Sequence, residues 1–233
     1  MKSATEPAKT PLPLSPGQQS REAILLAAAR LATLRGLDGL SIGDLAAEVG
    51  MSKSGLYAHF KSKEELELAT IETAAQIFRE DVLSPALAGS PGVRRLLALV
   101  DAFLSHLQRR VFPGGCFFAA VAAELDTRPG RARDRVAEIQ RDWLALLEQC
   151  FVDAQTNAEI ASPTDVGQAV FETQAMLLAA NFLFVMSADP SRLKQARQGI
   201  EHVLTRLSSH SAHQRSPRGT QGMRSASSKD RMS

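Results

Sequence analysis

The sequence predicts an all-helical protein, and three observations lead to this prediction. Aromatic residues make up only 5% of the chain, and no useful length of it alternates apolar and polar side chains as a strand would. Between residues 21 and 208, apolar side chains instead recur three and four positions apart. Ser, Asp, Pro and Gly interrupt this pattern where helices would begin and end.

The first helix is expected to begin after Ser20, as its N-cap, and to end at Gly36. Ser41 and Asp44 have the spacing of a capping box, which predicts a short helix ended by Gly50. A second short helix is expected from Ser52 to Phe60. The sequence Ser62-Lys63-Glu64-Glu65 then caps a long helix that runs towards Ser84-Pro85. These four helices predict one compact unit.

Longer helices are expected in the second half. They run from Pro91 to Phe112, from about Cys116 to Asp126, and from Pro129 past Phe151. Ser162-Pro163 and Asp189-Pro190 each resemble an N-cap followed by proline at the first helical position, so they predict helices over 163–187 and 190–208. The first of these is apolar nearly all round, which predicts that another subunit covers one of its sides.

Composition excludes several classes of protein. The 233 residues are 44% apolar, enough for a sizeable core, and two cysteines are too few for a disulfide scaffold or a Cys-rich zinc module. The five histidines lack metal-ligand spacing, and no Ser/His/Asp or phosphate-loop signature occurs. We therefore expect no enzyme activity, no catalytic residues, no metal and no cofactor.

The two ends of the chain differ from the rest. The first 20 residues hold four of the 11 prolines and no signal-like apolar run, and we expect a disordered arm over 1–19. Residues 209–233 carry a surplus of 4 positive charges and are expected to form a basic disordered tail. The most apolar run, 175–186, is shorter than the ~20 residues that cross a bilayer. A cytoplasmic protein that does not contact membranes is expected.

The segment from Ser41 to Leu66 carries the functional signal. Leu56 and Phe60 are four residues apart and would face inward, which leaves Lys53, Ser54 and Tyr57 on the outer side and His59 at its edge. Residues 51–63 contain three lysines and no carboxylate. A helix-turn-helix that lays its second helix in the major groove needs such a face.

The region from Arg21 to Leu68 resembles the DNA-binding domain of the tetracycline-repressor (TetR) family of bacterial transcriptional regulators. The matching residues are Ile24, Ala28, Gly36, Ser41-Ile42, Asp44-Leu45-Ala46, Gly50, Ser52-Lys53, Leu56-Tyr57, His59-Phe60 and 62–66. The resemblance implies an N-terminal three-helix helix-turn-helix domain over 20–66. It also implies a larger C-terminal helical domain over 67–208 that binds a ligand and dimerises.

The same resemblance implies a role for each matching residue. Ser41 would meet a phosphate, and Ser52, Lys53 and Ser54 would approach bases or phosphates. Tyr57, His59 and Lys63 would contact the DNA backbone. Gly55 and Ala32 depart from the family pattern, at a position that commonly carries a hydroxyl and at one that commonly carries a core aromatic, respectively.

The function implied by the resemblance is that of a repressor that binds a near-palindromic double-stranded DNA operator as a homodimer and is released by a small-molecule inducer. The last two helices are the candidate dimer interface, and a largely apolar inducer is expected. The candidate ligand-binding residues are Phe103, Leu107, Phe117, Trp143, Leu147, Phe171, Gln174 and Leu178. The segment 113–118 followed by Glu124 also resembles one branch of the family. A cluster of charged residues is interpreted as a solvated helix junction and not as a site: Glu124, Asp126, Arg128, Arg131, Arg133 and Arg135.

Two alternatives remain open at this point. Cys116 follows two glycines near a helix start, where a thiolate is favoured, so the protein could be a thiol-based redox-sensing regulator. A structural DNA-binding protein without an inducer is the other alternative, and the long apolar second domain argues against it.

Overall fold

The computed structural model describes residues 15–213, with side chains up to Ser208, and this part of the chain is helical without strands. The all-α prediction is therefore confirmed. The expected arm up to residue 14 and residues 214–233 of the expected tail lie outside the described residues. Residues 209–213, expected in that disordered tail, belong instead to the last helix. The elements are α1 (Pro16–Arg35), α2 (Ile42–Glu48), α3 (Lys53–Tyr57), α4 (Lys63–Phe78), the π-helix η1 (Arg79–Leu83), α5 (Ser84–Leu87), α6 (Val93–Gln108), α7 (Phe117–Leu125), α8 (Arg131–Thr156), α9 (Val166–Ser187) and α10 (Ser191–His213).

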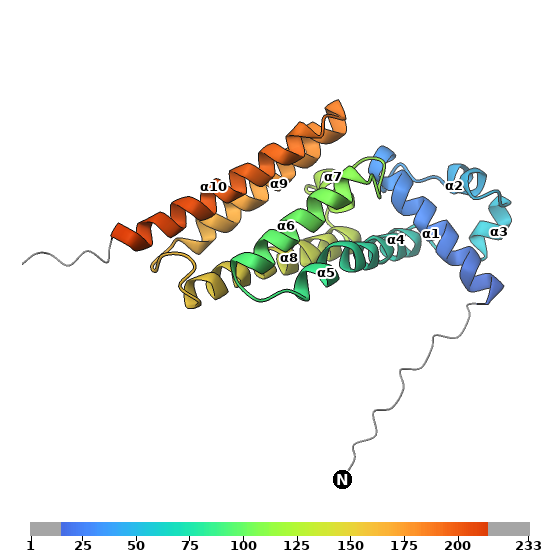
Figure 1. Cartoon of the computed structure of the whole chain (residues 1–233). Helices are drawn as coiled ribbons and strands as arrows, with labels where there is room; N and C mark the ends of the chain where they lie inside the picture. The colour runs from blue at the N-terminus through green and yellow to red at the C-terminus, as the bar shows by residue number, and fades with distance from the viewer. Residues whose placement is uncertain (1–14, 214–233) are drawn as a thin grey trace, which may run out of the picture.

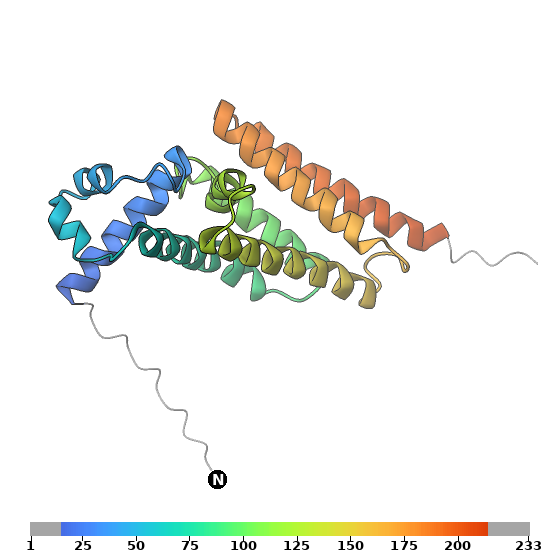
Figure 2. The same cartoon turned by 180° about the vertical axis from the view of Figure 1, so that it is seen from behind.

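The helices form two groups, one at each end of the molecule. Figures 1 and 2 show α1, α2 and α3 at one end and the antiparallel pair α9 and α10 along the flank of the other. Between them, α4 packs against both α1 and α8. The long helix α4 therefore belongs physically to both groups.

The start of α1 differs from the prediction. Ser15, and not Ser20, is the N-cap: its hydroxyl accepts from Gln18 N, and the Gln18 side chain accepts from Ser15 N at 2.9 Å. Pro16 occupies the first helical position, where its missing N–H costs nothing. The hydroxyl of Ser20 donates to Pro16 O at 2.9 Å within the helix. Residues 16–19, expected in the disordered arm, are thus the first turn of α1.

The caps of the next helices follow the prediction more closely. Ser41 Oγ accepts from Asp44 N at 3.0 Å, and Ser62 Oγ accepts from Glu65 N at 3.1 Å. Asp44 does not complete the expected capping box; its carboxylate pairs with Arg35 at 3.3 Å instead. The helix expected from Ser52 to Phe60 is the shorter α3.

The turn before α9 is a second correction. Ser162 does not cap the helix; Asp165 does, by accepting from Gln168 N at 2.9 Å. Residues 161–164 form a turn, since Thr164 Oγ1 donates to Ala161 O at 2.6 Å and the Gln155 amide donates to Thr164 O at 3.2 Å. These bonds hold the backbone out of the helical path until residue 165.

One face of α9 has no partner within the described chain. Ala169, Leu177 and Ala180 are buried, while several large apolar side chains of the same helix are exposed: Phe171 (69%), Leu178, Phe182 (63%), Leu183, Val185 and Met186 (73%). Among the described helices, α9 alone is long and apolar enough to span a membrane, and only part of it is buried within the chain. Its packing against α10 and α8 is that of a core helix with one uncovered side.

Candidate nucleic-acid interface and ligand cavity

The outer face of α3 presents the predicted polar residues. Leu56 is fully buried and Phe60 nearly so, and they fix α3 against the core of the first three helices. Lys53 and Ser54 are exposed, and Tyr57 is 62% exposed with its ring outward. A short, acid-free surface of hydroxyl, ammonium and phenol groups results.

Two exposed serines, one at the start of α3 and one at the start of α2, cap their helices and keep a hydroxyl group towards solvent. Ser52 Oγ accepts from Gly55 N at 3.1 Å and lies 3.1 Å from Ser54 Oγ. Ser41 caps α2 in the same manner. A capping serine accepts through its oxygen, so its O–H can still donate to a phosphate oxygen.

His59 and Lys63 are less free than the resemblance implies. His59 is half-buried beside the ring of Phe60. Lys63 Nζ lies 2.7 Å from Asp38 Oδ1 and 2.8 Å from Asp38 O. The hydrogen bond and charge of Lys63 are the main cause of the lowered pKa of Asp38, and the same bond raises the pKa of Lys63. In the free protein, the ammonium of Lys63 is therefore bound to Asp38, in the turn that follows α1.

The carboxylate of Glu124 joins α7 to the turn after α1. Its two oxygens accept from Leu37 N at 2.7 Å and from Asp38 N at 2.8 Å. Arg128 adds a contact to Asp38 Oδ2 at 2.9 Å. The expectation of a solvated junction is wrong at Glu124. Its side chain is only 17% exposed, and it binds the backbone of Leu37 and Asp38, which are 87 and 86 positions away in the sequence.

The turn that precedes α7 is in close contact with both α1 and α9. Gly114 N donates to Thr33 Oγ1 of α1 at 3.0 Å, and a Cβ at Gly114 would lie 1.9 Å from Thr33 O. Cys116 N donates to Asn181 Oδ1 of α9 at 2.8 Å. The beginning of α7 is thus held between the first helix and the uncovered helix α9.

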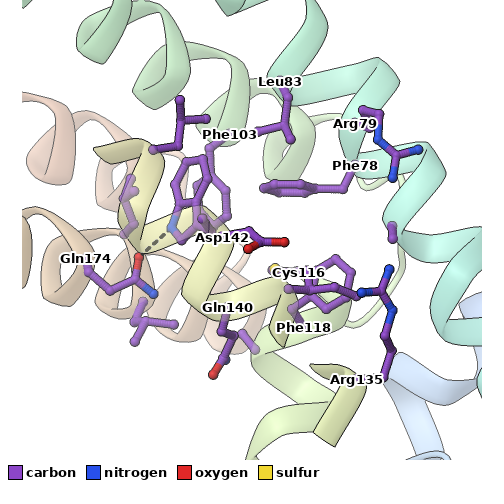
Figure 3. Close-up of a pocket in the computed structure, with 17 residues that line it drawn as sticks. Phe78, Arg79, Leu83, Phe103, Cys116, Phe118, Arg135, Gln140, Asp142 and Gln174 are labelled. Atoms are coloured by element: carbon purple, nitrogen blue, oxygen red, sulfur yellow. Dashed lines mark hydrogen bonds between the residues drawn. The ribbon is translucent and has the colours of Figure 1, made fainter. Parts of the chain in front are cut away.

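A cavity of about 200 Å³ lies among α4, α6, α7, α8 and α9 (Figure 3). Of the eight candidate ligand-binding residues, four line it: Phe103, Trp143, Gln174 and Leu178. The other four do not. Leu107, Phe117 and Leu147 are fully buried in the core, and Phe171 is on the uncovered face of α9.

Sequence reasoning missed the ring of Phe78 and that of Phe118, which both line the cavity. It also missed the polar part of the wall, which consists of Arg79, Arg135, Gln140 and Asp142. These residues belong to α4, η1, α7 and α8. The periodicity of a single helix cannot predict that side chains from four elements meet at one cavity. The wall of this cavity is therefore mostly apolar, with several polar side chains among its lining residues.

Cys116 also lines the cavity, but its thiol is not activated. The side chain is buried, and this burial raises the pKa of the thiol above its ordinary value despite weak opposing backbone hydrogen bonds. Burial likewise raises the pKa of Cys150 to about 11. The thiolate that a redox sensor requires is disfavoured at both positions. Among the described residues, no cluster of three or more His, Cys, Asp or Glu side chains could hold a metal ion.

An all-helical chain with an exposed helix-turn-helix face and a separate internal cavity defines a one-component DNA-binding regulator. Comparison with known proteins agrees with this class. Residues 24–70 match the family described as bacterial regulatory proteins, tetR family, and residues 92–200 match the tetracyclin repressor-like C-terminal domain. The chain belongs to the TetR family of transcriptional regulators.

Individual relatives support the same assignment. The HTH-type transcriptional repressor NemR of Escherichia coli K12 is 22% identical over 79% of this chain and 94% of its own length. A TetR regulator from Chloroflexus aurantiacus superposes with a TM-score of 0.73 and 28% identity, over 81% of this chain and 94% of that one. AibR, crystallised with isovaleryl coenzyme A and operator DNA, gives a TM-score of 0.64 and 26% identity, over 81% and 98%.

Proposed function

We propose that this chain is a cytoplasmic repressor that binds a near-palindromic operator as a homodimer and is released by a small molecule. The exposed, acid-free face of α3 is the observation that carries the proposal, since Lys53, Ser54 and Tyr57 have their inner neighbours buried and their own polar groups outward. Small donors near the start of a recognition helix can reach base edges, while hydroxyl and basic groups around them bind phosphates.

In this proposal, Ser52, Lys53 and Ser54 approach bases or phosphates, and Tyr57 contacts the DNA backbone. Ser41 meets a phosphate from the start of α2. His59 and Lys63 contact the backbone at the edges of this surface, and Lys63 does so only after its ammonium leaves Asp38. Until then, the backbone N–H groups of Lys63 and Glu64 at the start of α4 could bind a phosphate, whereas Glu65 N is bound to Ser62 Oγ.

A homodimer is proposed because the uncovered apolar face of α9 needs a partner of the same kind. Pairing α9 and α10 with their symmetry mates would bury Phe182 and Met186 in a four-helix bundle. Two-fold symmetry would then place two copies of α3 about 34–36 Å apart, one turn of duplex, so that each reads one half of the operator.

The two proposed domains meet within α4. A division into 20–66 and 67–208 cuts this helix after its first turn, so any change in its tilt moves both parts. The contacts of Glu124 add a second connection from α7, whose first residues line the cavity. Ligand binding would release DNA by favouring a dimer in which these two connections set a different half-site spacing.

Ligand binding is supported by the cavity itself and by the complex of AibR with isovaleryl coenzyme A. The experiment that tests the proposed function is fluorescence anisotropy with the promoter fragment upstream of the chain's own gene. We expect binding that is at least about 10³-fold tighter than to a shuffled fragment and that weakens steeply with salt. Equal affinity for both fragments would refute the proposal.

A further inference from the structure

We propose that the cavity takes an organic cation with an aromatic or branched apolar body, and that Asp142 binds the positive charge. The inference deepens the proposed function, because it names the chemical class of the ligand for the same cavity. Three features of the described residues carry it: the rings in the wall, the carboxylate of Asp142, and the occupied state of the nearby guanidinium groups.

Four aromatic rings form the apolar wall. Phe78 is at their centre, with its ring centroid 6.3 Å from that of Phe103, 5.8 Å from that of Phe118 and 5.6 Å from that of Trp143. The chain has one Trp, one Tyr and 10 Phe, so a third of its aromatic side chains line this cavity. Aromatic faces carry partial negative charge and attract cations that have left water.

The orientation of the indole ring is fixed. Trp143 Nε1 donates to Gln174 Oε1 at 2.8 Å, and the ring stacks on that of Phe103 with an interplanar angle of 26°. A ring held in place loses little conformational freedom when a ligand arrives. The wall is therefore already arranged for an apolar body.

Asp142 brings a negative charge to this wall. It lines the cavity from α8, and its carboxylate points into the space between Phe78 and Cys116 in Figure 3. Within residues 15–208 the Asp142 side chain forms neither an ion pair nor a hydrogen bond, in contrast to Asp134 on the same helix, which pairs with Arg133 at 3.5 Å. Asp142 is exposed, so water solvates its carboxylate in the free protein. A cationic group held against the neighbouring rings would add attraction to this carboxylate, whereas a neutral ligand would not.

An anionic ligand is the rival class, because two guanidinium groups also reach the cavity. Arg135, however, already binds two carboxylates: those of Glu72, through two of its nitrogens, and of Glu138, at 2.7 Å. These hydrogen bonds raise the pKa of Arg135 and lower that of Glu72.

Arg79, the first residue of η1, likewise interacts with side chains of the preceding helix α4. Its guanidinium donates to Gln76 Oε1, and its charge contributes to the lowered pKa of Glu72. Both guanidinium groups therefore interact with side chains of α4 and α8, whereas Asp142 is left for the ligand.

Three isosteric probes test the inference with the intact protein: phenyltrimethylammonium, the neutral tert-butylbenzene and the anion benzenesulfonate. Because Trp143 is the only tryptophan in the sequence, its fluorescence reports on the cavity directly. Thermal stabilisation at saturating probe gives an independent measure of binding. We expect the cation to bind at least about tenfold more tightly than the neutral probe, and the anion to bind more weakly than both.

Two substitutions on α8 separate the cavity carboxylate from general surface charge. Asp142→Asn should bring the affinities for cation and neutral probe within about twofold of each other. Asp134→Asn removes the same charge from a position that is equally exposed on α8 but does not line the cavity, and it should change none of the affinities.

Equal affinity for cation and neutral probe, tightest binding of the anion, equal losses in the two variants, or no binding of any probe would each overturn the inference. Its failure is distinguishable from failure of the proposed function, because operator binding by the free protein requires none of these probes. A chain that binds its operator but does not prefer the cation would keep the proposed function and lose only this ligand class.

Discussion

The outer faces of α3 and α9 are both exposed, and they differ in chemistry. On α3 the exposed groups are the ammonium of Lys53, the hydroxyl of Ser54 and the phenol of Tyr57. On α9 they are hydrocarbon, chiefly Phe182 and Met186. Each helix buries its other side in the chain, so each outer face is available for a partner.

The difference teaches which kind of partner each face fits. Water solvates the α3 face well, so leaving it exposed costs little, and it can meet a charged, hydrated duplex. Exposure of the apolar α9 face to water is unfavourable in free energy, which favours permanent coverage by another apolar surface. One face fits a reversible contact with DNA and the other a lasting contact between subunits.

The largest expected effect comes from placing a charge on the apolar face. Phe182→Glu should yield monomers, because the carboxylate would be buried without a partner in the bundle. Losing the second recognition helix should weaken operator binding by about 10²-fold or more. Analytical ultracentrifugation and anisotropy measure both.

The matched control is Leu87→Glu on α5, which is exposed on the other side of the molecule (Figures 1 and 2). It should remain dimeric and bind normally. A Phe182→Glu protein that stays dimeric would show that α9 is not the subunit interface.

The next effect tests the polar face. Lys53→Ala combined with Tyr57→Phe should weaken operator binding by about 1–3 kcal/mol per lost base contact and less for lost phosphate contacts. The salt dependence should also become shallower, by about one ion per lysine. Lys194→Ala on α10 removes an equal charge far from α3 and should leave both quantities unchanged. An unaltered salt slope in the double variant would contradict the roles of Lys53 and Tyr57.

A smaller effect is expected from the connection between the two regions. In Glu124→Gln, an amide N–H would face one of the two backbone N–H groups that the carboxylate now accepts from. Loss of a charged hydrogen bond costs about 1.5–3 kcal/mol, which lowers Tm by about 3–12 °C in a chain of this size. Hydrogen exchange at Leu37 and Asp38 should accelerate, whereas Glu148→Gln, exposed on α8, should change neither quantity. Unchanged hydrogen exchange at Leu37 and Asp38 would show that Glu124 does not stabilise the contact between α7 and the turn after α1.

The smallest expected effect concerns the thiols. Because burial raises the pKa of Cys116 and that of Cys150, little thiolate is present near neutral pH, and its fraction grows as the pH rises towards these pKa values. Diamide should therefore change operator affinity by less than about twofold at pH 7. A large loss that dithiothreitol reverses would restore the redox-sensing alternative.

Local features of the first domain were predictable from the sequence. The caps at Ser41 and Ser62 and the inward positions of Leu56 and Phe60 agree with the structure. The N-cap of α1 was misplaced, because Ser20 and Ser15 both precede helical spacing and only Ser15 is followed by proline at the first helical position. These features depend on side chains within four residues of one another, which is the range that sequence pattern reports.

By itself, the sequence determined the helical class, the recognition helix and the apolar character of α9, because each follows from short-range periodicity and capping. Tertiary structure alone decided that Phe78 and Phe118 line the cavity while Leu107 and Leu147 fill the core. It likewise decided that Glu124 reaches the turn after α1. A helix shows which of its residues share a face, but the helix that meets this face is chosen by packing among segments many residues apart.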